Sequence, residues 1–236
     1  MFNKTIALVV SALLSGMAVA TPVLTAEPAL ARSGKALSSH ENLDVDLGIS
    51  ELPSNVEAFL ALRERLAKTP EGAVAVFLVA LNVYGENRDL GKTFLTIAVD
   101  ARHVKDSEEP GSYKGKIINK NRTREFNRVL ENSPNTARAY WKGAGPDNGY
   151  KADKPFAAKI YKVKGTEARA DKYAEATTGR AVEELKLFVM SEGYRNASGG
   201  GRPISVAKNA AGVWKVTRFS GVVAAVMKTP GPTDDL

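Results

Sequence analysis

The chain has 236 residues, of which 44% are hydrophobic, and it contains no cysteine. The absence of cysteine excludes disulfides, thiolate metal sites and cysteine nucleophiles. A formal net charge of +7 and this length predict a basic protein with one sizeable core.

The first residues have the pattern of a secretory signal peptide. One lysine precedes an apolar run over residues 6–20, which ends in the small-x-small cleavage pattern Ala18-Val19-Ala20. A second such pattern, Ala29-Leu30-Ala31, gives an alternative cleavage point. Because the run is shorter than the roughly 20 residues of a membrane-spanning helix, an anchor is disfavoured. We therefore predict a signal peptide over residues 1–20, or alternatively 1–31. The protein is then exported, periplasmic or secreted, with no transmembrane segment after cleavage.

Composition then separates a linker from a domain. Residues 21–50 are rich in Ala, Pro and Ser without sustained periodicity, which predicts a flexible linker. Residues 51–228 combine periodic segments with turns and are predicted to form a single α+β domain. Residues 229–236 are predicted to be a disordered tail.

Two helix-start signals open the domain. Ser54 with Glu57 fits a capping box before a first amphipathic helix that ends near Leu66. Thr69-Pro70-Glu71 places a cap, a proline and an acid where a second helix begins. The run Ala73–Tyr84 is apolar on all sides, which predicts a central buried helix.

Two further helices are predicted from apolar spacing. The third is marked by Leu90, Phe94, Ile97 and Ala98. The fourth covers about residues 119–131 and buries Phe126, Val129 and Leu130.

After Tyr150 the apolar spacing changes from a helical period to a period of two. The predicted strands cover residues 156–163, 185–190, 204–208 and 213–219, with 222–227 extending the last strand or adding another. Residues 209–212 form a four-residue hairpin loop between the last two strands. Helices first and strands second predict an α+β fold in which N-terminal helices pack on a C-terminal antiparallel sheet.

One segment comes close to a phosphate-binding loop but departs from its spacing. Five residues separate Gly85 from Gly91, which precedes a Lys-Thr pair, whereas that loop allows four. The chain has two histidines, His40 in the predicted linker and His103 at a helix end. Neither has a second histidine at the spacing of metal ligands, so both are predicted to lie at the surface. No serine lies in a G-x-S-x-G motif. The sequence therefore predicts no nucleotide, cofactor or metal site, and no catalytic residue.

Positive charge is concentrated in the middle of the chain. Residues 112–164 hold 13 Lys and Arg against 4 Asp and Glu, a net charge of +9. The candidate binding residues of this block are its basic side chains Lys120, Arg122, Arg124, Arg128, Arg138 and Lys142. Two interpretations stay open. The block forms a groove for an anionic polymer, or it is a solvated helix face that pairs with the acidic N-terminal helices.

The densest turn chemistry lies between residues 140 and 150. Tyr140, Trp141 and Tyr150 frame a loop with three glycines, one proline and an Asn-Gly pair. Exposed aromatics in such a loop would indicate binding, so these three are also candidate binding residues. The alternative is a structural corner between helices and sheet, with Trp141 and Tyr150 in the core.

A set of short motifs runs from the first helix to the last hairpin. They are Leu52-Pro53, Thr69-Pro70-Glu71-Gly72, Ala139-Tyr140-Trp141, Gly143-Ala144, Pro146, Asn148-Gly149-Tyr150 and Trp214-Lys215-Val216. Together they resemble an uncharacterised family of exported bacterial proteins with a domain of unknown function. The resemblance implies a single exported domain and no assigned activity. The final hairpin also resembles the end of cone-shaped, nuclear-transport-factor-2-like folds, which is the alternative architecture.

These observations favour a non-catalytic exported domain that binds another molecule or supports the cell envelope. Its partner would be an anionic envelope polymer or a protein. The alternative is an envelope hydrolase whose site is assembled only in the fold. A cleft holding two carboxylates, or a Ser–Lys pair, would indicate that alternative.

Overall fold

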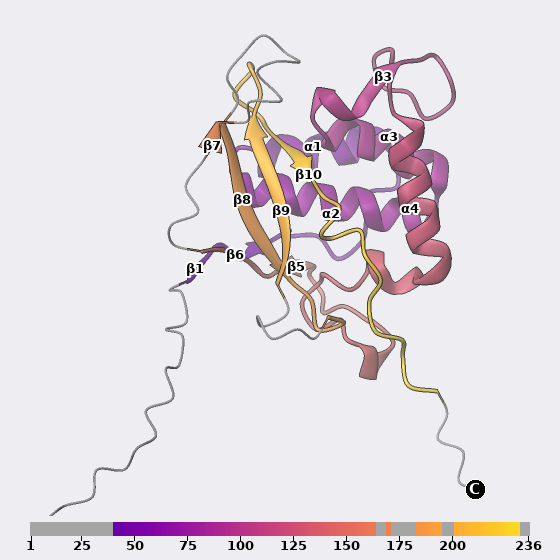
Figure 1. Cartoon of the computed structure of the whole chain (residues 1–236), viewed down its shortest axis with the longest axis vertical. Helices are drawn as coiled ribbons and strands as arrows, with labels where there is room; N and C mark the ends of the chain where they lie inside the picture. The colour runs from indigo at the N-terminus through magenta and orange to yellow at the C-terminus, as the bar shows by residue number, and fades with distance from the viewer. Residues whose placement is uncertain (1–39, 164–168, 171–182, 195–200, 232–236) are drawn as a thin grey trace, which may run out of the picture. The chain divides into compact units, whose positions relative to one another are not determined.

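The computed structural model describes residues 40–163, 169–170, 183–194 and 201–231. The predicted signal peptide, residues 21–39 of the predicted linker and residues 232–236 of the predicted tail lie outside the described residues. Helices and an antiparallel sheet together give the α+β fold that the sequence predicts (Figure 1).

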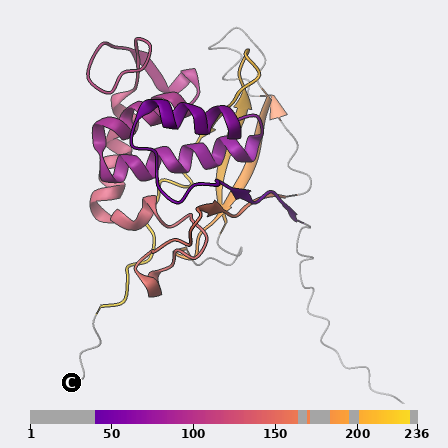
Figure 2. The same ribbon diagram turned by 180° about the vertical axis from the view of Figure 1, so that it is seen from behind.

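Among the described residues, four α-helices lie on one side of the sheet, as Figures 1 and 2 show from opposite directions. They are α1 (Val56–Leu66), α2 (Pro70–Glu86), α3 (Arg88–Ala98) and α4 (Lys120–Asn132). Three short 3-10 helices connect them to the rest: η1 (Ala101–His103), η2 (Pro134–Ala137) and η3 (Pro146–Asn148). None of the helices in the described part of the chain has the length and hydropathy that a membrane span requires.

The main sheet is antiparallel, and its strands follow the order β1-β6-β8-β9-β10, with β7 also paired to β8. Its strands are β1 (His40–Asn42), β6 (Ile160–Val163), β7 (Arg169–Ala170), β8 (Glu183–Met190), β9 (Gly201–Lys208) and β10 (Trp214–Arg218). Two small antiparallel pairs are β2 (Val45–Asp46) with β5 (Ala157–Ala158), and β3 (Val104–Asp106) with β4 (Lys116–Ile118). The predicted strand over 156–163 is therefore divided between two sheets, and residues 222–227 form no strand.

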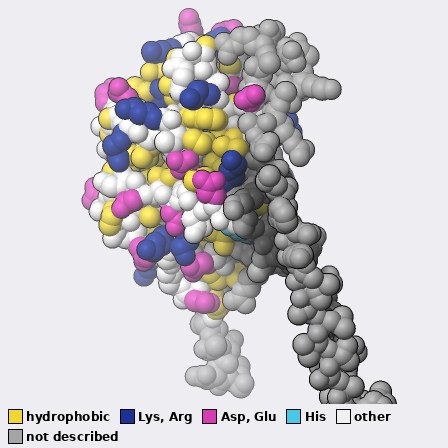
Figure 3. Space-filling model, turned by 90° about the vertical axis from the view of Figure 1, so that its left-hand side faces the viewer, with side chains coloured by type: hydrophobic (Ala, Val, Ile, Leu, Met, Phe, Trp, Pro, Cys, Tyr) yellow, Lys and Arg dark blue, Asp and Glu magenta, His cyan; other side chains and the backbone are white. Residues whose placement is uncertain are grey.

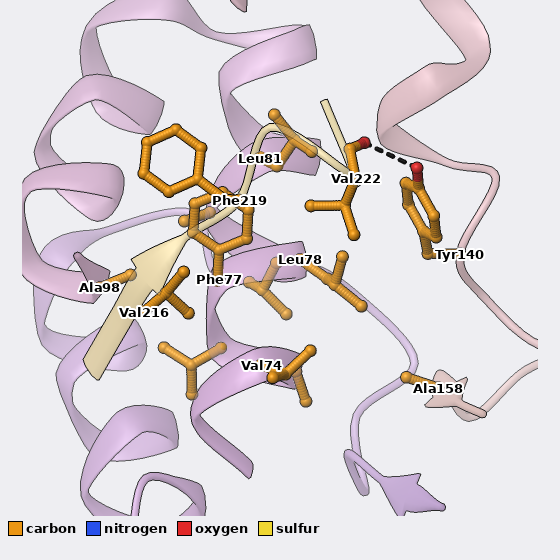
Figure 4. Close-up of a cluster of buried hydrophobic side chains, with 14 of the residues drawn as sticks. Val74, Phe77, Leu78, Leu81, Ala98, Tyr140, Ala158, Val216, Phe219 and Val222 are labelled. Carbon is orange, nitrogen blue, oxygen red and sulfur yellow. Dashed lines mark hydrogen bonds between the residues drawn. The ribbon is translucent and has the colours of Figure 1, made fainter. Parts of the chain in front are cut away.

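The helix α2 is the centre of the fold. The Thr69 hydroxyl accepts a hydrogen bond from the Gly72 amide at 3.1 Å, and Pro70 occupies the first turn, as the start signal predicts. Every residue from Gly72 to Tyr84 is buried. In the core, Phe77 of α2 lies beside Phe219, which follows β10, with ring centroids 5.2 Å apart (Figure 4). A helix that is apolar all round is thus covered on every side.

Two local predictions need correction. The cap of α1 is Asn55, not Ser54, because the Asn55 side chain accepts from the Ala58 amide at 2.8 Å. Asparagine caps a helix at least as well as serine, so the start moves by one residue. The predicted linker is wrong for residues 40–50, where β1 pairs with β6 and β2 pairs with β5. Val45 of β2 and Leu47, which follows it, are buried, and the pairing partners of both strands lie more than a hundred residues along the chain.

We predict that Gly91→Ala destabilises the domain by at least about 3 kcal/mol, the upper end of the usual range for overpacking. An added Cβ would lie 2.1 Å from the Tyr84 Cα atom, at the crossing of α2 and α3, so the two backbones would have to separate. Urea unfolding measures the loss. The matched control is Gly85→Ala, whose Cβ meets only the Ala137 Cβ at 3.4 Å. It should stay within about 1 kcal/mol of the wild type, and equal losses in both variants would contradict the packing argument.

Candidate functional site

The aromatic residues of the 140–150 loop belong to the core. Tyr140, Trp141 and Tyr150 are only 1%, 3% and 2% exposed. The Tyr140 hydroxyl donates to the Val222 carbonyl at 2.6 Å (Figure 4), and the Tyr150 hydroxyl donates to the Met227 carbonyl at 2.5 Å. Burial raises the pKa of both phenols, most strongly that of Tyr140, so both stay protonated and can donate at neutral pH. The structural corner is therefore the interpretation that these contacts support.

The loop itself is held by a polar residue at its tip. The Asn148 side chain accepts from the Gly145 and Lys151 amides and donates to the Gly143 and Lys151 carbonyls. Gly143, Gly149 and Tyr150 have positive φ angles of 79°, 67° and 59°. Such backbone conformations explain why the loop needs glycine at the first two positions.

The segment after β10 is fixed by side chains instead of strand pairing. The hydroxyls of Tyr140 and Tyr150 donate to carbonyls of this segment, as described above. The Thr136 hydroxyl also donates to it, at the Ala224 carbonyl, at 3.3 Å. The Arg202 guanidinium donates to the carbonyls of Gly221 and Ala225 at 3.2 and 2.9 Å. Because side chains satisfy these carbonyls, the apolar residues 222–227 are ordered without becoming the predicted strand.

A cleft of about 700 Å³ lies beside the loop. It is lined by Tyr140, Trp141, Lys142, Gly143, Gly145, Pro146, Asp147, Asn148, Lys159, Met190, Ser191, Glu192 and Tyr194. Two of these residues, Trp141 and Ser191, hold a buried polar atom, Nε1 and Oγ, without a hydrogen-bond partner among the described residues. The cleft therefore combines two exposed carboxylates, two exposed lysines and two unsatisfied polar atoms.

The basic candidate residues do not form one site. Arg138 is exposed after η2, Lys142 lies in the cleft, and the other four lie on α4. Lys120, Arg124 and Arg128 are exposed and make no ion pair with any described residue. Their exposure agrees with the solvated helix face of the second interpretation, whereas the pairing with the acidic N-terminal helices in that interpretation is not formed by these three residues.

A second pocket, of about 620 Å³, lies at the N-terminal end of α4. We call it the arginine pocket, and it is lined by Arg102, His103, Asn119, Asn121, Arg122, Thr217 and Arg218. Its residues come from η1, the first turn of α4 and the end of β10. Of this set, the sequence pointed only to Arg122 as a binding residue.

Arg122 is held by three neighbours. Its Nε donates to His103 Nδ1 at 3.3 Å, its Nη1 donates to the Glu125 carboxylate at 3.0 Å, and its guanidinium lies 5.3 Å from the centre of the Phe219 ring. The Nη2 group has no partner among the described residues. One end of a fixed guanidinium thus remains available.

His103 is buried, 8% exposed, so the predicted surface position is wrong. Its Nδ1 accepts from Arg122, and its Nε2 therefore carries the proton and donates to the Thr217 carbonyl at 2.6 Å. Burial lowers the pKa of His103, and the charge of Arg122 lowers that pKa further. A neutral His103 thus fixes the orientation of Arg122 relative to β10.

The other two arginines of the pocket share one carboxylate. Glu184 of β8 contacts Arg102 Nη2 at 3.1 Å and Arg218 Nε at 2.8 Å. Asp100 contacts Arg102 Nε at 2.7 Å. The acids thus position the guanidiniums, while none of them lines the pocket.

The first turn of α4 has an unusual charge. The helices α1, α2 and α3 each carry an acid there, Glu57, Glu71 and Asp89, as the positive end of a helix dipole favours. In α4 the cap is Asn119, and the turn holds Lys120 and Arg122 without an acid. The amides of Lys120 and Asn121 have no acceptor among the described residues. Arg122 is compensated by Glu125 of the next turn, whereas the charge of Lys120 at this end of the helix has no acid beside it among the described residues.

The fold and this site define an α+β domain with an arginine pocket at a helix N-terminus. The chain belongs to the family described as Domain of unknown function (DUF6935), whose model matches residues 51–230. This confirms the predicted membership in an uncharacterised family. No curated protein and no solved structure matches the chain. The nuclear-transport-factor-2-like alternative therefore stays a prediction.

We predict that Trp141→Ala lowers the free energy of unfolding by about 3–5 kcal/mol, because it leaves a cavity against Phe156, whose ring centroid is 5.3 Å away. Denaturant melts measure the change. Trp214→Ala is the control, since Trp214 is only partly buried and should cost less. A loss below about 1 kcal/mol for Trp141 would show that its ring contributes little to the core.

Proposed function

We propose that this protein is an exported, non-catalytic domain that binds an anionic polymer of the cell envelope through α4. The observation that carries the proposal is the first turn of α4, which holds no acid: Arg122 pairs with Glu125 of the next turn, whereas Lys120 lies at the positive end of the helix without an ion pair to any described residue. Such an arrangement is unfavourable on its own, and an anionic ligand would remove the conflict.

A polymer fits the helix better than a single ion does. Lys120, Arg124 and Arg128 follow one another at intervals of four residues and so lie on one face of α4. At 1.5 Å per residue this stripe is about 12 Å long. We call these three residues the α4 stripe. A ligand with charges at regular intervals could contact the stripe and the arginine pocket together.

The opposite end of the molecule supports the same choice. Figure 3 shows the face that lies on the left in Figure 1, whereas α4 lies on the right there. Among the described residues of that face, acidic and basic side chains are interspersed among hydrophobic ones. A mixed surface of this kind offers no continuous attraction to a polyanion.

Export rests on the N-terminal sequence pattern, which is the basis for placing the ligand in the envelope. We predict that the mature protein begins at Thr21 or Arg32. Intact-mass measurement of protein recovered outside the cytoplasm decides between the two. A recovered protein that keeps Met1 would contradict cleavage.

We predict that polyphosphate binding weakens roughly tenfold or more between 50 and 200 mM salt, because contact by three or more cations releases condensed counterions. Reversal of Lys120, Arg124 and Arg128 together to Glu should abolish binding. The thermal midpoint should stay the same or rise slightly, because these side chains lack ion pairs and an acid suits the helix N-terminus. Thermophoresis and thermal melts provide the two measurements.

The control reverses three other exposed lysines, Lys68, Lys151 and Lys228, which changes the net charge by the same amount. This variant should keep most of the affinity. Binding that ignores salt, or an equal loss in both variants, would contradict a specific role for α4.

The cleft favours a second candidate function, an envelope hydrolase. Asp147 and Glu192 both line it, together with Ser191 and two lysines. The Ser191 hydroxyl has no hydrogen-bond partner among the described residues, so no base contacts it in this conformation. Release of soluble fragments from purified cell walls, lost in Glu192→Gln, would establish the hydrolase in place of the binding domain.

A further inference from the structure

We infer that the arginine pocket is a subsite for one phosphate group of the polymer, an inference that rests on the proposed function. The pocket is lined by donors from three separate elements. A tetrahedral oxyanion can accept hydrogen bonds from several directions at once. A carboxylate has its acceptor positions in one plane and pairs best with a single guanidinium fork.

Arg122 supplies the donor with the clearest geometry. Its Nε and Nη1 groups are occupied by His103 and Glu125, which leaves Nη2 for a ligand. His103 takes its own orientation from the Thr217 carbonyl, so the chain of contacts runs from β10 to the guanidinium. A ligand oxygen would meet a side chain that is already in place, which reduces the entropy lost on binding.

Thr217 supplies an independent observation. It is 3% exposed and lines the pocket, and its hydroxyl has no hydrogen-bond partner among the described residues. A buried hydroxyl without a partner is costly, and a bound phosphate oxygen would satisfy it. Asn121 also lines the pocket, and its amide, at the N-terminal end of a helix of 13 residues, has no acceptor among the described residues and suits the same anion.

The charge balance explains why one phosphate alone would bind weakly. The three arginines of the pocket contact three acids, Asp100, Glu125 and Glu184. The local charge is therefore close to neutral, and hydrogen-bond direction, not net charge, selects the ligand. A polymer would gain affinity from the α4 stripe, while the pocket would select phosphate over other anions.

Thr217→Val tests the inference, because it removes the hydroxyl and keeps the shape of the side chain. Without ligand, the variant should have the same or a higher thermal midpoint, since no hydrogen bond to a described residue is lost. In an NMR shift titration with inorganic phosphate, it should weaken binding about tenfold, the loss of one hydrogen bond to a charged ligand. Thr217→Ser keeps the hydroxyl and should bind as the wild type does.

Two further variants separate the pocket from the stripe. Arg122→Gln should weaken inorganic phosphate binding about tenfold or more, whereas Arg128→Gln should change it less than about threefold. Polyphosphate should bind the wild type more tightly than poly-L-glutamate of matched length, and Thr217→Val should remove that preference. These results would assign the phosphate selectivity to the pocket.

The two proposals fail in different ways. Equal affinity for both polymers, or unchanged phosphate binding in Thr217→Val, would overturn the subsite and leave the polyanion surface intact. Binding of inorganic phosphate at the pocket without binding of either polymer would overturn the proposed function and show that the site takes free phosphate. If inorganic phosphate shifts no pocket resonance at millimolar concentration, the subsite is wrong.

Discussion

The burial of α2 is the constraint on which the rest of the structure depends. Its residues from Gly72 to Tyr84 are all buried, so every side of the helix requires a covering element. The α1 and α3 helices cover it from one direction and the strands β9 and β10 from another, while the segment after β10 adds Phe219 and Val222 (Figure 4). Close approach is possible where side chains are absent, as at Gly91 against Tyr84. A single helix thus determines which distant parts of the chain must pack together.

Elements with local signals were predictable from the sequence. The cap and proline at Thr69-Pro70 give α2 its start, and the spacing of Phe126, Val129 and Leu130 gives α4 its buried face. Asn209 and Gly212, which has a φ of 77°, give the last hairpin its turn.

Elements that depend on distant partners were missed. The strands at residues 40–46 become ordered only by pairing with β5 and β6, and the pairing of β3 with β4 spans an irregular loop. The apolar residues 222–227 were assigned to a strand because the sequence does not show that side chains such as Tyr140 and Arg202 bind their carbonyls.

The candidate site follows the same division. Arg122 could be selected from the sequence because it lies in a block with a net charge of +9. Arg102, Thr217 and Arg218 could not, since they lie between 20 and 96 residues away in the sequence and meet Arg122 only through the packing of η1 and β10. One local signal was present: the first turn of the helix predicted over 119–131 has basic residues and no acid, although the positive end of the helix dipole favours acids.

The aromatic loop shows the opposite case, in which a pattern typical of binding loops has a structural role because its tyrosines donate to buried carbonyls.

The arginine pocket and the core are connected through one side chain. Phe219 packs against Phe77 of α2, Phe126 of α4 and His103 of η1, with ring centroids between 4.9 and 5.4 Å apart, and the Arg122 guanidinium lies over it. Arg122 is therefore supported by the same ring that closes the core beneath it. A guanidinium on a mobile loop would lose rotational freedom when it binds an anion, whereas this one has already lost it during folding. The cost of ordering Arg122 is thus part of the stability of the domain, and in the proposed subsite this fixed geometry would let a pocket with little net charge distinguish one anion from another.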